Sequence, residues 1–264
     1  MSLPRCPSVS AGKAYWLLCV LFIAVLSSYL ELEAKGASSV VARQGLSLEN
    51  RKQLVDRLRA ITGWTSLDFD SNGALLLGST DAAGGSVTAR RLVAAILQSQ
   101  AAIVLEESSK RPDIAFCQVS LASWKKQENG PASTVYVVSI DFADFGHLNG
   151  HPQAVAAFDV GWVVLHEFDH ILNNSSDADL LEDVGECEAH INQMRQECGL
   201  PIRAQYFFAN LPLTAHGPFV TNWVRLAFEE RSPNARKKRY WLVWDAGLVG
   251  GTIYSRQVAS MQSR

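Results

Sequence analysis

Apolar residues recur at helical spacing in two early segments of the chain. The first segment predicts a helix that begins at Ser47 or Glu49 and ends before Gly63, with its apolar face at Leu54, Leu58 and Ile61. The second predicts a helix over residues 86–100 that is capped by Ser86 or Thr88. Residues 67–77 between them are apolar runs around Asn72-Gly73, a dipeptide that favours a tight hairpin turn.

β-Branched and aromatic residues then dominate three segments that we interpret as strands, at residues 102–105, 114–119 and 134–142. Helical patterns follow over residues 152–173 and 180–198. After Pro201 the pattern predicts strands at 206–208 and 240–244, and a helix over 221–230 with Trp223 and Leu226 turned inward. The order predicts an α+β fold in which a small mixed sheet is followed by two successive helices.

The first 36 residues form a separate unit by composition. Arg5 and Lys13 precede an uncharged, apolar run at residues 14–30, and acidic residues follow it. This layout is typical of a secretory signal peptide, which we favour, or of an uncleaved N-terminal membrane anchor. We therefore expect an exported protein that is periplasmic, extracellular or associated with the membrane through residues 14–30. Residues 37–47 are expected to be a linker and residues 48–264 a single domain.

The charge of the chain bears on its partners, and its cysteines bear on disulfide formation. The chain carries 24 basic and 26 acidic residues, and this net charge of −2 does not favour a nucleic acid as partner. Beyond the leader the cysteines are Cys117, Cys187 and Cys198, so at most one internal disulfide can form, and its pairing stays open.

The most informative motif is His166-Glu167-Phe168-Asp169-His170, within an apolar helical segment. Residues four apart lie on one face of a helix, so His166 and His170 can direct two imidazole nitrogens at one Zn²⁺ ion. Glu167 would lie beside the open position of the metal, where a carboxylate can act as general base toward the attacking water. Two ordinary core histidines with an unrelated acid are the alternative interpretation.

The motif resembles that of the zincin (HExxH) zinc metallopeptidases. In this family the third ligand is either six residues beyond the second histidine or a glutamate on a following helix. Position 176 is Ser176, and Asp177 lies one residue too far along the chain. The resemblance therefore favours Glu188 as third ligand, with Asn192 four residues later as its hydrogen-bonding partner, and leaves Glu186 and Asp177 as alternatives.

A second resemblance concerns the tract from Asn192 to Pro201. It is similar to a tract in uncharacterised predicted bacterial metallopeptidases, and it implies a zinc peptidase with no assigned substrate. We therefore expect a zincin-like domain that hydrolyses peptide bonds in a peptide or protein substrate. The alternatives are a catalytically inactive envelope binding protein with the same fold, and a metal-dependent amidohydrolase that acts on a non-peptide amide.

Two further features follow from the expected chemistry. The strand at 134–142 would be an edge strand to which a substrate peptide adds by backbone hydrogen bonds. The negative charge of a tetrahedral intermediate needs a hydrogen-bond donor, and we select Tyr206 and His216 over three further candidates, His147, His190 and Tyr240.

Overall fold

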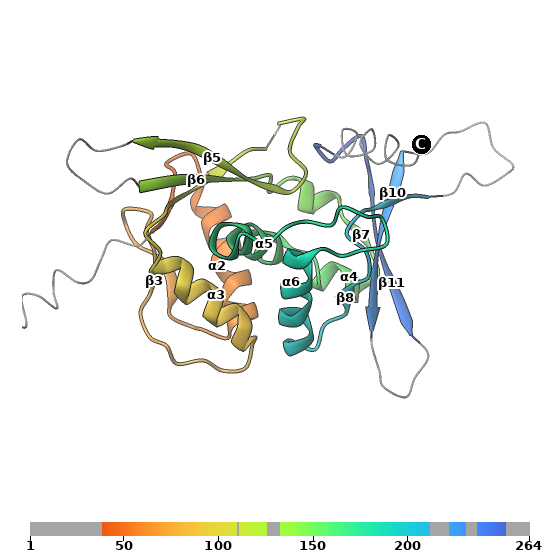
Figure 1. Ribbon diagram of the computed structural model, residues 1–264, viewed down its shortest axis with the longest axis horizontal. Helices are drawn as coiled ribbons and strands as arrows, with labels where there is room; N and C mark the ends of the chain where they lie inside the picture. The colour runs from red at the N-terminus through yellow and green to blue at the C-terminus, as the bar shows by residue number, and fades with distance from the viewer. Residues whose placement is uncertain (1–38, 110, 126–132, 212–221, 231–236, 252–264) are drawn as a thin grey trace, which may run out of the picture. The chain divides into compact units, whose positions relative to one another are not determined.

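The computed structural model describes residues 39–109, 111–125, 133–211, 222–230 and 237–251, which belong to one compact unit that begins at Ser38 (Figure 1). Its architecture is α+β, as predicted. The helices are α2 (Leu48–Thr62), α3 (Val87–Leu97), α4 (Pro152–Ala156), α5 (Val160–Asn173) and α6 (Glu186–Glu197), with a short 3₁₀ helix η1 (Asp144–His147). The predicted leader, residues 14–30 included, lies outside the described residues.

Local sequence signals predicted helices α2 and α3 and the hairpin between them correctly. Ser47 caps α2 by accepting a hydrogen bond from the backbone N–H of Asn50 (3.1 Å), and Gly63 ends it in a left-handed conformation with φ 75°. Ser86 caps α3 in the same way. The predicted hairpin is confirmed as strands β2 (Leu67–Phe69) and β3 (Leu75–Leu77), which pair antiparallel.

A four-stranded sheet forms the first layer, in the order β1 (Val40–Ala42), β4 (Ala102–Glu107), β6 (Ser133–Ile140) and β5 (Cys117–Lys125). β1, β4 and β6 are parallel, whereas β5 pairs antiparallel with β6. Two predictions are wrong here. Residues 40–42 are a strand rather than part of a linker, because Val40 is fully buried against β4. Residues 134–142 are not an edge strand, since β6 lies between β4 and β5, and the edges of this sheet are β1 and β5.

The predicted helix over 152–173 is two helices. It breaks at residues 157–159, and Asp159 restarts it by accepting the backbone N–H of Gly161 (2.9 Å) and of Trp162 (3.3 Å). The predicted helix over 180–198 begins only at Glu186, as α6, because Gly185 precedes it with φ 77°.

The second sheet contains the C-terminal strands. Its path is β7 (Asn149–Gly150), β11 (Lys238–Asp245), β10 (Trp223–Glu230) and β8 (Ile202–Arg203), and β9 (Ala209–Asn210) also pairs with β10. The predicted helix over 221–230 is wrong: β10 pairs with β11 along its whole length, and Trp223 is exposed. Residues 206–208 are not a strand either, although 240–244 lies within β11 as predicted.

Helix α5 lies at the centre of the fold, in contact with α2, α3, α6 and β5 (Figure 1). Its apolar side chains Trp162, Leu165 and Phe168 are buried, so packing fixes the position of the helix. Among the described residues, none of the helices combines the length and apolar content needed to span a bilayer.

Candidate metal centre

His166 and His170 face one another on α5, one helical turn apart. Their rings lie 4.7 Å apart between centroids and nearly perpendicular, at 85°. Neither ring is freely exposed, with side-chain exposures of 11% and 19%. The burial of α5 therefore presents two imidazoles to one small volume, as the spacing of the motif predicts.

Asp177 brings a carboxylate to both histidines. Its Oδ1 lies 3.0 Å from Nε2 of His166 and 3.3 Å from Nε2 of His170. In the sequence Asp177 lies one position beyond the spacing of a zincin third ligand. The structure removes that objection, because α5 runs through Asn173 and the chain reverses at Asn174, which has a left-handed conformation (φ 52°). The loop after this turn returns the Asp177 carboxylate to the histidines.

These distances fit a zinc ion. Nitrogen and oxygen donors bound at about 2.0–2.1 Å in tetrahedral geometry lie about 3.3 Å from one another. The two carboxylate-to-nitrogen separations, 3.0 and 3.3 Å, are close to that spacing. His166, His170 and Asp177 are thus a suitable donor set for zinc.

The remaining nitrogen of each imidazole faces a hydrogen-bond acceptor. Nδ1 of His170 lies 2.7 Å from the backbone oxygen of Ser175, and Nδ1 of His166 lies 3.4 Å from Oε2 of Glu188. These oxygens can accept the Nδ1 hydrogens, and with that tautomer each Nε2, which faces Asp177, would be available to a metal. Glu188, predicted to be a ligand, therefore occupies the place of a group that orients His166.

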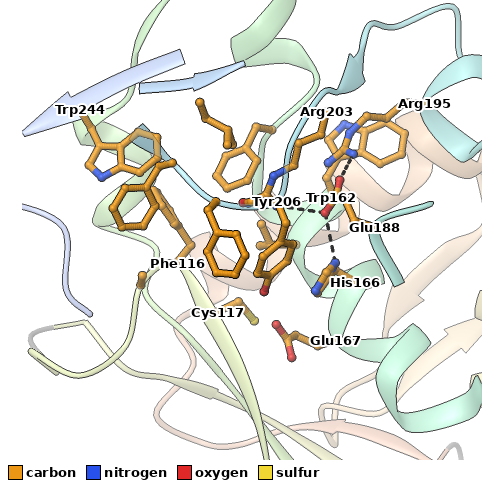
Figure 2. Close-up of a pocket in the computed structure, with 16 residues that line it drawn as sticks. Phe116, Cys117, Trp162, His166, Glu167, Glu188, Arg195, Arg203, Tyr206 and Trp244 are labelled. Atoms are coloured by element: carbon orange, nitrogen blue, oxygen red, sulfur yellow. Dashed lines mark hydrogen bonds and ion pairs between the residues drawn. The ribbon is translucent and has the colours of Figure 1, made fainter. Parts of the chain in front are cut away.

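Glu188 is held by two arginines (Figure 2). Arg195 and Arg203 both form ion pairs with its carboxylate, and Glu188 and Arg195 are each 1% exposed. Burial raises the pKa of Glu188, but the two guanidinium groups outweigh burial and hold the pKa well below its usual range. This carboxylate stays ionised and already has two strong partners.

The other residues proposed near Glu188 have different surroundings. The Asn192 amide oxygen accepts from the backbone N–H of Arg203 (2.7 Å) and from the Arg195 guanidinium (2.9 Å), so Asn192 positions the arginines rather than Glu188 itself. Glu186 is exposed at the beginning of α6.

Cys187 is a candidate donor that sequence reasoning did not select. Its side chain is fully buried, its thiol donates to the backbone oxygen of His166 (3.3 Å), and it forms with His166 and His170 a group whose donor atoms all lie within 4.8 Å of one another. It lies 17 residues after His170, on another helix, so no local spacing could have indicated it. All three described cysteines are free thiols.

Glu167 points toward β5. Its Oε2 accepts a hydrogen bond from the backbone N–H of Val119 (2.9 Å), and only 8% of the residue is exposed. Burial raises the pKa of Glu167 above its usual value, whereas His166 and His170 oppose this increase. A carboxylate with a raised pKa is suited to accept and return a proton near neutral pH.

Without a metal, protonated imidazoles balance the negative charge of the Asp177 carboxylate. Hydrogen bonding to Asp177 raises the pKa of His170 to about 10. Burial raises the pKa of Asp177, but hydrogen bonds from the two histidines outweigh burial and hold that pKa far below its usual range. A cation that binds here must displace protons from the imidazoles, so its affinity increases with pH.

Only some of the residues predicted to stabilise the tetrahedral intermediate lie near His166 and His170. The Tyr206 ring stacks on His166, with centroids 6.1 Å apart and an interplanar angle of 23°, and its side chain interacts with Asp177. The Tyr240 hydroxyl donates to Glu230 instead (2.7 Å), and Nδ1 of His190 pairs with Asp169 (2.9 Å). His147 lies in η1, away from the ligand histidines in the sequence, and His216 lies outside the described residues.

Comparisons with protein-family models, with curated proteins and with solved structures found no match for this chain.

Proposed function

We propose that this chain is a zinc-dependent peptidase with a zincin-like arrangement of its active-site helix. The observation that carries the proposal is the position of Asp177 Oδ1 beside Nε2 of both His166 and His170, with Glu167 on the same helix. Three donors of this kind with an adjacent carboxylate are typical of catalytic zinc sites in hydrolases, whereas structural zinc sites use four protein donors.

Each residue has a distinct task in this proposal. His166, His170 and Asp177 would hold the zinc, and Glu188 and the Ser175 carbonyl would orient the imidazoles. When bound, zinc supplies Lewis acidity that activates water near neutral pH and polarises a carbonyl group. Glu167 accepts the proton of the attacking water and returns it to the leaving nitrogen of the substrate. For this step the Glu167 carboxylate must give up its hydrogen bond with the backbone N–H of Val119.

The free edge of β5 would bind the substrate backbone. In the described part of the chain β5 pairs with β6 alone, and the N–H of Val119 points out of the sheet toward Glu167. An extended peptide that adds to this edge by backbone hydrogen bonds would pass the metal-binding face of α5. This strand takes the role that the sequence had suggested for residues 134–142.

Tyr206 is the donor best placed to stabilise the charge that develops on the substrate carbonyl. It lines the same cavity as His166 and Glu167, and burial raises its pKa, so the phenol keeps its proton at neutral pH. A protonated hydroxyl can donate to a developing oxyanion.

Two variants test the function. Glu167→Gln is expected to retain one zinc per chain, measured by metal analysis, while kcat for a peptide library falls by about 10²–10⁴-fold because the proton acceptor is lost. His166→Ala is expected to lose both zinc and activity, and Glu182→Gln, at an exposed position, is a matched control that should change neither.

The possible outcomes separate the rival functions. A wild-type protein that holds zinc but cleaves no peptide would favour the binding protein or the non-peptide amidohydrolase. Unchanged zinc content in His166→Ala would exclude the metal centre itself.

A further inference from the structure

A cavity of about 190 Å³ opens directly beside His166 and Glu167. Figure 2 shows His166 and Glu188 on one side of it, Phe116 and Trp244 on the opposite side, and Tyr206 between them. Helix α5, the loop after β8 and strands β10 and β11 all contribute to its wall. The cavity thus begins where the proposed chemistry takes place and extends away from the metal-binding residues.

Aromatic and aliphatic side chains form most of the wall. The Phe116 ring packs edge-on against Trp244 and Phe158, with centroids 5.5 and 5.0 Å apart, and Phe208 packs on Trp244 at 5.6 Å. Leu226 and Val163 complete the apolar lining. An apolar group that enters the cavity would be removed from water and would contact the faces and edges of aromatic rings on several sides.

Three charged residues of the wall, Glu188, Arg195 and Arg203, are paired with one another. Glu188 is bound by Arg195 and Arg203, and the Arg203 guanidinium lies over the Tyr206 ring, 4.7 Å from its centroid. Glu167 accepts from Val119. A charged guest would give up its hydration without gaining an equivalent partner, so the cavity disfavours charged side chains.

The volume of the cavity further limits which groups it can bind. Pockets that hold whole small-molecule ligands have volumes of about 300–1,000 Å³, so this cavity is too small for most cofactors. It is suited to one large side chain whose backbone stays outside, at the edge of β5.

We propose that this cavity is the specificity pocket of the enzyme and binds a large apolar side chain, aromatic or leucine, of a substrate residue that flanks the cleaved bond. The inference rests on the proposed peptidase function, because it places the substrate backbone between β5 and α5. It adds the substrate class: peptides with a bulky apolar residue at the cleavage site.

Binding is tested first, without any need for turnover. The zinc-loaded Glu167→Gln protein is titrated with N-acetylphenylalanine amide, N-acetylalanine amide and N-acetyllysine amide, and binding is followed by NMR. The phenylalanine compound is expected to bind about tenfold or more tightly than the other two, because only its side chain buries a large apolar surface. Equal binding of all three would overturn the proposal.

Filling the cavity provides the second test. Val163 lines it three residues before His166, so Val163→Phe reduces its volume without replacing a proposed ligand. This variant is expected to reduce kcat/KM for substrates with phenylalanine or tryptophan at the cleavage site by at least about tenfold. Val87→Phe, the same change at an exposed position of α3, is the matched control and should have no effect.

A third variant enlarges the cavity. Phe208→Ala removes one wall of the pocket and is expected to shift the preference from phenylalanine toward tryptophan. This keeps the proposal testable if Val163→Phe does not fold.

These experiments distinguish failure of the specificity-pocket proposal from failure of the proposed peptidase function. If the wild type cleaves no peptide, the peptidase proposal is wrong, and the binding titration still decides whether the cavity takes apolar groups. If it cleaves peptides without preference for bulky apolar residues, or if Val163→Phe leaves the preference unchanged, the specificity pocket is wrong.

Discussion

Oδ1 of Asp177 lies 3.0 Å from Nε2 of His166, although the two residues are eleven positions apart and the intervening chain leaves α5 through a left-handed turn. The contact joins the loop after α5 to the middle of that helix. In the proposed metal centre it would add a third donor to the two imidazoles from a segment of only twelve residues, and Glu188 would orient His166.

Replacement of Asp177 tests this donor set. Asp177→Ala is expected to abolish stoichiometric zinc binding, since two imidazoles alone hold the ion weakly. Isothermal titration calorimetry against zinc is the measurement, and Asp179→Ala, at an exposed position two residues later, is the control. If Asp177→Ala binds zinc as the wild type does, another residue completes the site.

Cobalt substitution distinguishes Asp177 from Cys187. If Asp177 is the third ligand, the cobalt protein should show visible d–d absorption but no intense near-ultraviolet band from thiolate-to-cobalt charge transfer. Cys187→Ser should then leave the spectrum unchanged, as should Cys198→Ser, whose thiol contacts the backbone of Ile61. A charge-transfer band that disappears only in Cys187→Ser would assign the cysteine as a ligand.

Glu188→Gln tests the orienting role. Loss of the negative charge leaves the buried Arg195 and the partly buried Arg203 without their counter-ion, so we expect the free energy of unfolding to fall by about 3–5 kcal/mol, measured by urea denaturation. Zinc affinity should fall by about 10–100-fold rather than be abolished. Glu186→Gln, exposed in the same helical turn, should alter neither quantity. Complete loss of zinc from a folded Glu188→Gln protein would restore Glu188 as a ligand.

Asp144 makes the free energy of unfolding depend on pH. It lies outside the sequence segment that contains the proposed metal ligands. Burial raises its pKa from 3.8 to about 6, although it accepts the backbone N–H of Phe116. The folded state therefore favours the protonated acid: this stabilisation is complete below about pH 4 and is lost as the pH rises through 6. Unfolding free energies between pH 4 and 7 should decrease in the wild type relative to Asp144→Asn. Asp81→Asn, at an exposed position, should follow the wild-type curve. Parallel curves for wild type and Asp144→Asn would contradict the assignment.

Local sequence decided the elements whose signals lie within a few residues. The caps at Ser47 and Ser86 and the Asn72-Gly73 turn depend on the chemistry of adjacent residues. The turn was predicted correctly, and each cap is one of the two residues that the sequence offered. The same holds for the pairing of His166 with His170, because helical geometry alone sets that spacing.

Contacts between distant segments decided the rest. Residues 223–230 have the composition of a helix or a strand, and pairing with β11 selects the strand. Val40 belongs to a strand only because Ile103 lies beside it in β4. The choice among Asp177, Glu188 and Cys187 likewise depended on where the turn at Asn174 directs the loop and on which carboxylate Arg195 and Arg203 had already bound. Sequence spacing predicts the helix face that carries two candidate ligands, whereas the third depends on long-range packing.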